Sequence, residues 1–205
     1  MNSAVNTTLI PVAELAPGAV AKIRNDTIQA VLAKASAETG LPTDKLVVRD
    51  IRSFDDLGWG TGTTITVTAL TENQWNFTLD DSETEGAFND LNSSSYVTMS
   101  NQRFVAIYGV KDRRMALATP IVPTMSELRF TTGGNVRAIW DLQVMEAYPD
   151  AMAAVTTSPI IIPQNTDYQI AGYNGLSDDG GSSDVVSYIM LEGFVVEPMG
   201  KVLSP

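Results

Sequence analysis

The sequence predicts an all-β fold, a single antiparallel sandwich of eight or nine strands with one helix near the N-terminus. Runs rich in Thr, Val and Ile recur along the 205 residues and alternate with clusters of Gly, Pro, Asn and Asp, as strands alternate with turns. Hydrophobic residues make up 44% of the chain, which is enough to fill one substantial core. No internal repeat of about 20 to 50 residues is visible, so propellers and solenoids are disfavoured.

One segment, Asn25 to Thr39, has the spacing of an amphipathic helix. Its apolar residues recur three and four positions apart: Ile28, Val31, Leu32 and Ala35. Asn25 or Asp26 is placed to cap it, and Gly40 with Pro42 to end it. We expect the helix to cover one end of the β core or to contact a neighbouring subunit. Residues 1–44 are therefore assigned to an N-terminal arm and helix, and 45–205 to the sandwich.

The first strands follow Pro42. Lys45 to Ile51 is a short strand with apolar residues on both faces. Thr63 to Leu70 alternates strictly and forms a hairpin with Trp75 to Leu79. Asp80 to Ser95 is polar and acidic, and it is expected to be a long loop.

The middle of the chain predicts a buried strand and a second hairpin. Arg103 to Val110 is apolar on both faces, as a central strand is. Ala116 to Val122 is a further strand that prolines confine to an edge. Leu128 to Thr132 and Val136 to Val144 flank Gly133-Gly134-Asn135, a strong turn signal. Its buried face is expected to combine Leu128 and Phe130 with Val136, Trp140 and Leu142.

The C-terminal third predicts Pro159 to Ile162, Tyr168 to Tyr173 and one long strand, Val185 to Glu197. A strand of that length exceeds the usual ~5 to 6 residues, so a bulge is expected at Gly193. The strand spacing as a whole is typical of a sandwich, a jelly roll or a barrel.

The composition disfavours most enzymatic chemistry. The chain has no histidine and no cysteine, so it lacks the usual general base, thiol nucleophile and metal ligands. Gly58 to Gly62 resembles a phosphate-binding loop, but a Thr-rich strand follows it where a helix is needed. Glu146 and Glu192 lie in or near apolar strands and are the candidates for a glycosidase pair, although nothing places them together. We expect no catalytic residue, no cofactor and no small-molecule substrate.

Two acidic clusters have the composition of calcium loops, which offer six to eight oxygens. They are Asp80, Asp81, Glu83 and Glu85, and Asp178, Asp179 and Asp184. Neither matches the spacing of an EF-hand, so we interpret both as solvated charge and assign no metal ligand.

The charge pattern argues against direct binding of nucleic acid. Thirteen Lys and Arg against 24 Asp and Glu give a net charge of -11, which repels a phosphate backbone. The N-terminus does not have the pattern of a signal peptide, and no stretch reaches the ~20 apolar residues of a membrane span.

Three features carry a resemblance to a known family: the N-terminal helix, the eight strands separated by turn residues, and the C-terminal runs IIIPQNTDYQIAGYNG and VVSYIMLEGFVVEP. In these features the chain resembles a viral jelly-roll coat protein, particularly one of a tailless or membrane-containing phage. The resemblance covers the chain from about Leu46 onward. It implies a single jelly roll, a role as a capsid subunit made in the host cytoplasm, and a location in the virion. The implied partners are copies of the chain, other virion proteins and an internal membrane. Four aromatic residues are candidate subunit contacts: Trp59, Phe88, Tyr173 and Phe194.

The alternative is a carbohydrate-binding or adhesin-like β-sandwich. It would require exposed aromatic residues on one face, or a calcium-dependent loop.

Overall fold

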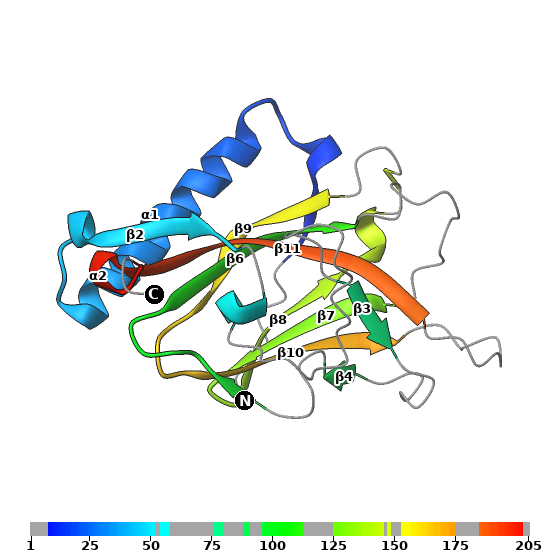
Figure 1. Cartoon of the computed structure of the whole chain (residues 1–205). Coiled ribbons are helices and arrows are strands. Elements are labelled where there is room, and N and C mark those ends of the chain that lie inside the picture. The colour runs from blue at the N-terminus through cyan, green and yellow to red at the C-terminus, as the bar shows by residue number, and fades with distance from the viewer. Residues whose placement is uncertain are drawn as a thin grey trace.

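Two antiparallel sheets and a long helix form three layers in the computed structural model (Figure 1). The structure describes residues 8–51, 54–57, 76–79, 88–90, 96–112, 125–145, 147–148, 153–174 and 185–202. The strands are β1 (Ile10–Pro11), β2 (Leu46–Asp50), β3 (Asn76–Leu79), β4 (Phe88–Asp90), β5 (Val97–Thr98), β6 (Phe104–Asp112), β7 (Met125–Thr132), β8 (Asn135–Asp141), β9 (Ala153–Ile162), β10 (Asp167–Asn174) and β11 (Val185–Pro198). The helices are α1 (Ala19–Thr39) and α2 (Met199–Val202), with short 3-10 turns at Val12–Glu14, Thr43–Lys45, Phe54–Leu57 and Gln143–Met145.

The larger sheet has the order β1-β9-β6-β11-β2, with β3 also paired to β11, and the smaller has β4-β10-β7-β8, with β5 also paired to β10. Nine of these eleven described strands have three or more residues, so the predicted antiparallel sandwich is confirmed. The main core lies between the sheets and includes Trp140, Phe130 and Tyr168. The rings of Phe130 and Trp140 have centroids 4.6 Å apart.

The strand pairs are nested. β2 pairs with β11, β4 with β10, β6 with β9, and β7 with β8. The first and third pairs belong to the larger sheet, and the second and fourth to the smaller. Counted along the chain, these eight strands therefore pair first with eighth, second with seventh, third with sixth and fourth with fifth. The chain folds as one long hairpin that crosses between the sheets and turns at Gly133–Gly134.

This nesting gives the sandwich two different ends. At one end, short turns at residues 99–103, 133–134 and 163–166 join the strands, and we call it the compact end. At the other end, which we call the long-connection end, residues 113–124, 142–152 and 175–184 run from one strand to the next.

Helix α1 is longer than predicted: it begins at Ala19, six residues before Asn25, and ends at Gly40 as expected. Asn25 and Asp26 are therefore inside the helix and not at its N-cap, which is Gly18, and the Asp26 carboxylate pairs with Lys22 one turn earlier at 2.5 Å. The added turns are held by tertiary packing, since Ile23 is buried against the outer face of the larger sheet. Val31 and Ala35 fill the same face further along, next to Phe104. Figure 1 shows α1 lying across this sheet, on the side away from the smaller one.

Three other predictions need correction. Residues 80–95 are not loop throughout, because Phe88–Asp90 pairs with β10 as β4. The strand predicted at Pro159 begins at Ala153, and Pro159 is accommodated because it lies where the ladder to β6 shifts register, between Val155 and Ile160, and beyond the residues that pair with β1. Val136 is not in the core but 37% exposed, because it lies beside the turn on an edge strand where the register shifts.

The bulge predicted at Gly193 is present: the ladder between β11 and β6 shifts register between Glu192 and Gly193. The hairpin at Gly133–Gly134 is also confirmed, and both glycines have positive φ, 55° and 74°. The strand predicted at Thr63 to Leu70 and the one at Ala116 to Val122 lie outside the described residues.

Candidate functional site

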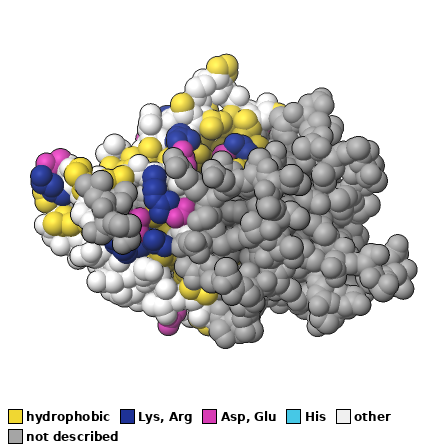
Figure 2. All heavy atoms as spheres, in the orientation of Figure 1, with side chains coloured by type: hydrophobic (Ala, Val, Ile, Leu, Met, Phe, Trp, Pro, Cys, Tyr) yellow, Lys and Arg dark blue, Asp and Glu magenta, His cyan; other side chains and the backbone are white. Residues whose placement is uncertain are grey.

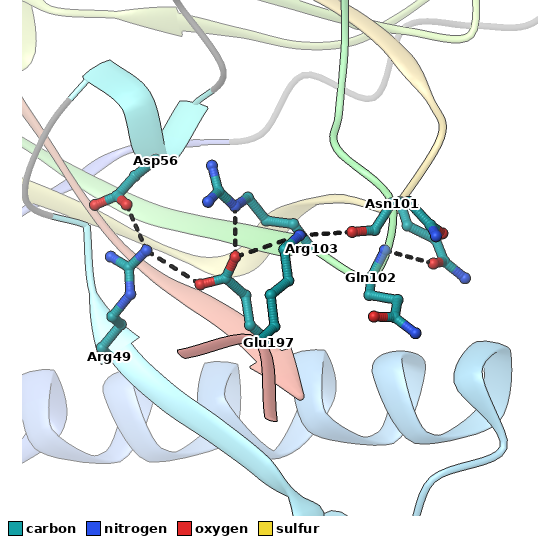
Figure 3. A network of polar contacts seen from close by, with 8 residues as sticks. Arg49, Asp56, Asn101, Gln102, Arg103 and Glu197 are labelled. Atoms are coloured by element: carbon teal, nitrogen blue, oxygen red, sulfur yellow. Dashed lines mark hydrogen bonds and ion pairs between the residues drawn. The ribbon is translucent and has the colours of Figure 1, made fainter. Parts of the chain in front are cut away.

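A buried carboxylate at the compact end gathers the basic side chains around it (Figure 3). The side chain of Glu197, near the end of β11, is 6% exposed. Its oxygens accept hydrogen bonds from Arg103 Nε at 2.8 Å and from Arg49 Nη2 at 3.2 Å. The ammonium of Lys201 lies 3.6 Å away. This is the densest group of charges among the residues that the structure describes.

Strand register explains why these residues meet. In the ladder between β2 and β11, Glu197 lies opposite Val47, so Arg49 is its diagonal neighbour on the same face. Lys201 follows Glu197 by one helical turn in α2. Arg103 ends the turn that leads into β6, the other neighbour of β11.

The network extends at both sides. Arg49 Nη2 also donates to Asp56 Oδ1 at 2.5 Å, and the Asp56 side chain is 7% exposed. Lys201 Nζ donates to the Asn101 carbonyl oxygen at 2.7 Å, which ties α2 to the turn at 99–103. Figure 3 shows the line of contacts from Asp56 through Arg49 and Glu197 to Asn101. The network thus fastens β2, β11, α2 and two turns together.

The surroundings shift two pKa values. Burial by itself would raise the pKa of Glu197, but the Arg103 hydrogen bond and the three nearby positive charges hold that pKa below its ordinary value of 4.5. The hydrogen bond to Asp56 raises the pKa of Arg49 against the cost of burial, with the Glu197 charge adding to it. Glu197 is therefore a carboxylate and Arg49 a guanidinium cation at neutral pH. A buried carboxylate held by cations from β2, α2 and the turn before β6 is suited to holding these segments in place.

Sequence reasoning missed this network. Arg49 and Glu197 are 148 positions apart and meet only through the long-range ladder. A signal was present nonetheless, because each interrupts an apolar strand, Leu46-Val47-Val48-Arg49 and Phe194-Val195-Val196-Glu197. A charge in such a run is buried only if it is paired.

A cleft of about 490 Å³ lies at the same end, between α1, the turn from β7 to β8, and the last residues of β9. Its apolar wall consists of Pro159, Ile160, Ile161 and Pro163. Thr132, Ser158 and Thr166 add hydroxyl groups. The volume is in the range of clefts that bind small ligands or short peptide segments.

Two basic side chains, Lys34 and Arg137, line this cleft, and none of the other described lining residues is acidic. Lys34 pairs with Glu38 at 2.7 Å on its own helix. Arg137 donates through Nε to Thr132 Oγ1 at 2.7 Å, which fixes the plane of the guanidinium. Among the described residues no carboxylate pairs with Arg137. Its terminal N–H groups are therefore available to an anion.

The structure brings two of the four candidate contact residues together. Phe88 and Tyr173 are directly opposite each other in the ladder between β4 and β10. Tyr173 is partly buried, and β4 is one of the two edge strands of the smaller sheet as described. Trp59 lies outside the described residues.

Phe194, the fourth candidate, is 1% exposed and packs inside its own chain. Its ring stacks on Tyr108 with centroids 5.5 Å apart, and the Arg24 guanidinium lies 4.8 Å from the ring centroid. Helix α1 supplies Arg24 and Ile23 to this cluster. In this conformation the ring contributes to the attachment of α1 and offers no surface to a neighbour.

The residues considered for catalysis and for calcium are distributed as follows. Glu192 forms an ion pair with Lys111 across the ladder from β11 to β6. Glu146 and both acidic clusters lie outside the described residues. Within the described ranges, no three acidic side chains come together as a metal site would need. No helix in those ranges has both the length and the apolarity to cross a bilayer.

Comparison of the sequence with protein-family models gives no match, and comparison with curated proteins gives none either. The function therefore has to be argued from the strand order, the ion network and the surfaces.

Proposed function

We propose that this protein is a structural virion protein, a capsid or coat subunit that assembles with copies of itself into a symmetric oligomer or an icosahedral shell. The observation that carries the proposal is the nested strand order: first with eighth, second with seventh, third with sixth, and fourth with fifth, divided between two sheets. Eight strands in two sheets joined by two Greek keys make a jelly roll, the architecture of many viral coat domains. We therefore propose a single jelly roll.

Unpaired strand edges support assembly. Among the described strands, β8 ends the smaller sheet, and its residues 135–137 are exposed. Of these strands, only β1 and β6 pair with β9, and β1 covers Ala154 and Val155 alone, so no described strand pairs with the outer edge of the last residues of β9. Edges of this kind are a liability to a lone protein and become buried when copies associate.

The position of α1 limits how copies can meet. The helix covers the outer face of the larger sheet, so that face is not a contact between subunits. The surfaces left for contacts between copies are the sheet edges, the two ends of the sandwich and the exposed side of α1. In the view of Figure 2, acidic and basic side chains are interspersed over the part around β2, a pattern that favours specific pairing over non-specific association.

The competing function is carbohydrate binding, since lectins share the jelly-roll architecture. Sugar sites generally place an aromatic ring against the pyranose face. Among the described residues that line the cleft at the compact end, none is aromatic. Assembly is the better supported proposal for this reason.

Sedimentation velocity and negative-stain microscopy of the purified protein test the proposal. The expected result is a concentration-dependent series that ends in closed, symmetric particles. Other virion proteins or anionic vesicles, which stand for an internal membrane, are added in a second series to detect the further partners. A monomer at all concentrations in both series would overturn the proposal, and selective binding on a glycan array would favour the alternative.

A further inference from the structure

The cleft at the compact end is basic in a protein whose net charge is -11. Lys34 and Arg137 line it, and the part of the lining that the structure describes contains no acidic residue. Most other described cations are already paired, including Lys22, Arg24 and Lys111 with one carboxylate each. Arg137 is different because Thr132 orients its planar guanidinium group through Nε, and the terminal N–H groups have no partner among the described residues. A site of this form recognises a carboxylate, since guanidinium and carboxylate pair in two parallel hydrogen bonds.

The chain itself carries a segment with the matching chemistry. Residues 80–85 read Asp-Asp-Ser-Glu-Thr-Glu, four carboxylates in six positions. This segment joins Leu79 of β3 to Phe88 of β4. Leu79 lies opposite Val185, the first residue of β11, so the segment is attached near the long-connection end.

The acidic segment and the basic cleft thus belong to opposite ends of one sandwich. The last residues of β11, including Glu197, lie at the compact end. The first residue of β11 lies opposite Leu79, from which the acidic segment continues. A strand of 14 residues spans about 45 Å. Complementary surfaces at opposite ends favour a head-to-tail contact between copies, which closes into a ring when the rotation between neighbours allows it.

We propose that the cleft formed by α1, the β7–β8 turn and the end of β9 receives the acidic segment 80–85 of a second copy, with Arg137 as the residue that binds its carboxylates. This inference rests on the proposed function, because it describes one contact between subunits of the proposed oligomer. Within the cleft, Thr132, Ser158 and Thr166 offer hydroxyl groups, and Pro159 and Ile161 form an apolar wall.

Charge reversal with rescue tests the proposal. Arg137→Glu is expected to weaken association by about 10-fold to 100-fold, because like charges then face each other. The combined change of Asp80, Asp81, Glu83 and Glu85 to Lys is expected to weaken it similarly. Mixing the two variants in equal amounts should restore assembly, since each cleft then meets a segment of opposite charge. Lys22→Glu makes the same change of charge on α1 away from the cleft and is expected to assemble normally.

A peptide of residues 79–87 gives a second measurement that needs no assembly. It is expected to bind the wild-type protein and to bind Arg137→Glu at least about tenfold more weakly, as measured by fluorescence anisotropy. Equal binding to both proteins, or no binding, overturns the inference. Normal assembly of Arg137→Glu also overturns it but leaves the capsid proposal in place. A wild-type monomer that binds the peptide through Arg137 overturns the capsid proposal and supports the chemistry of the cleft.

Discussion

The backbone of Gly193 lies so close to the carbonyl group of Ala106 that no side chain fits between them. A Cβ atom on Gly193 would overlap the Ala106 oxygen and would lie 2.7 Å from Ile51 Cδ1. The ladder shifts register at this point, because Glu192 faces Gly109 and Gly193 faces Ile107, so the extra residue lies in β6.

Gly193→Ala is therefore expected to lower the free energy of unfolding by about 2 to 3 kcal/mol, because the added methyl group must push two central strands apart. Urea denaturation followed by circular dichroism measures the change. Gly200→Ala is the matched control, since a Cβ atom there meets nothing within 4 Å. Equal stability of the two variants would show that the close approach is absent.

Removal of the buried carboxylate tests the ion network. Glu197→Gln keeps the shape of the side chain but removes the negative charge that Arg49, Arg103 and Lys201 share, so a loss of about 3 kcal/mol in the free energy of unfolding is expected. The exposed pair of Lys34 and Glu38 provides the control. Glu38→Gln should cost less than about 0.5 kcal/mol. A loss at Glu197 no larger than the control would mean that the network contributes nothing to stability.

The lowered pKa of Glu197 predicts that the free energy of unfolding depends on pH in the acidic range. The pKa of Glu197 is lowered in the folded chain, so the unfolded chain binds the proton more readily. Its contribution to stability is present above the ordinary value of 4.5 and is lost as the pH falls below that value, through the folded pKa. The stability difference between wild type and Glu197→Gln should accordingly shrink on acidification. Denaturation curves at about pH 7, 5, 4 and 3 measure it, and a difference that stays constant down to pH 3 contradicts the prediction.

The raised pKa of Tyr108 predicts that the stability of the fold depends on pH in the alkaline range. Burial, with the charge of Glu192 added, raises its pKa to about 12. The contribution of the neutral phenol to stability is present below the ordinary value of 10.0 and is lost as the pH rises through the folded value. The tyrosinate absorbance that Tyr108→Phe removes should therefore appear only near pH 12, or earlier together with unfolding. A midpoint near 10 in a protein whose circular dichroism is unchanged would contradict the burial of this ring under α1.

The sequence determined the local features. The alternation of Thr, Val and Ile with turn residues gave the class of fold, and the pair Gly133-Gly134 gave the central hairpin, because both depend on the conformations of neighbouring residues. The length of β11 and its one glycine predicted the bulge for the same reason. The C-terminus of α1 at Gly40 was also local, set by a residue that adopts positive φ at φ 71°.

Only the tertiary structure decided what depends on contacts between distant segments. The start of α1 was set by the burial of Ile23 against the sheet, and the strand character of Phe88–Asp90 by pairing with β10. Strand register and the stacking of two sheets determine three further features. These are the nested strand order, the contact between Arg49 and Glu197, and the position of Arg137 in the basic cleft. Residue patterns carry propensity and periodicity, whereas the choice of partner strand is a property of the whole chain, settled by which arrangement buries the apolar faces and pairs the buried charges.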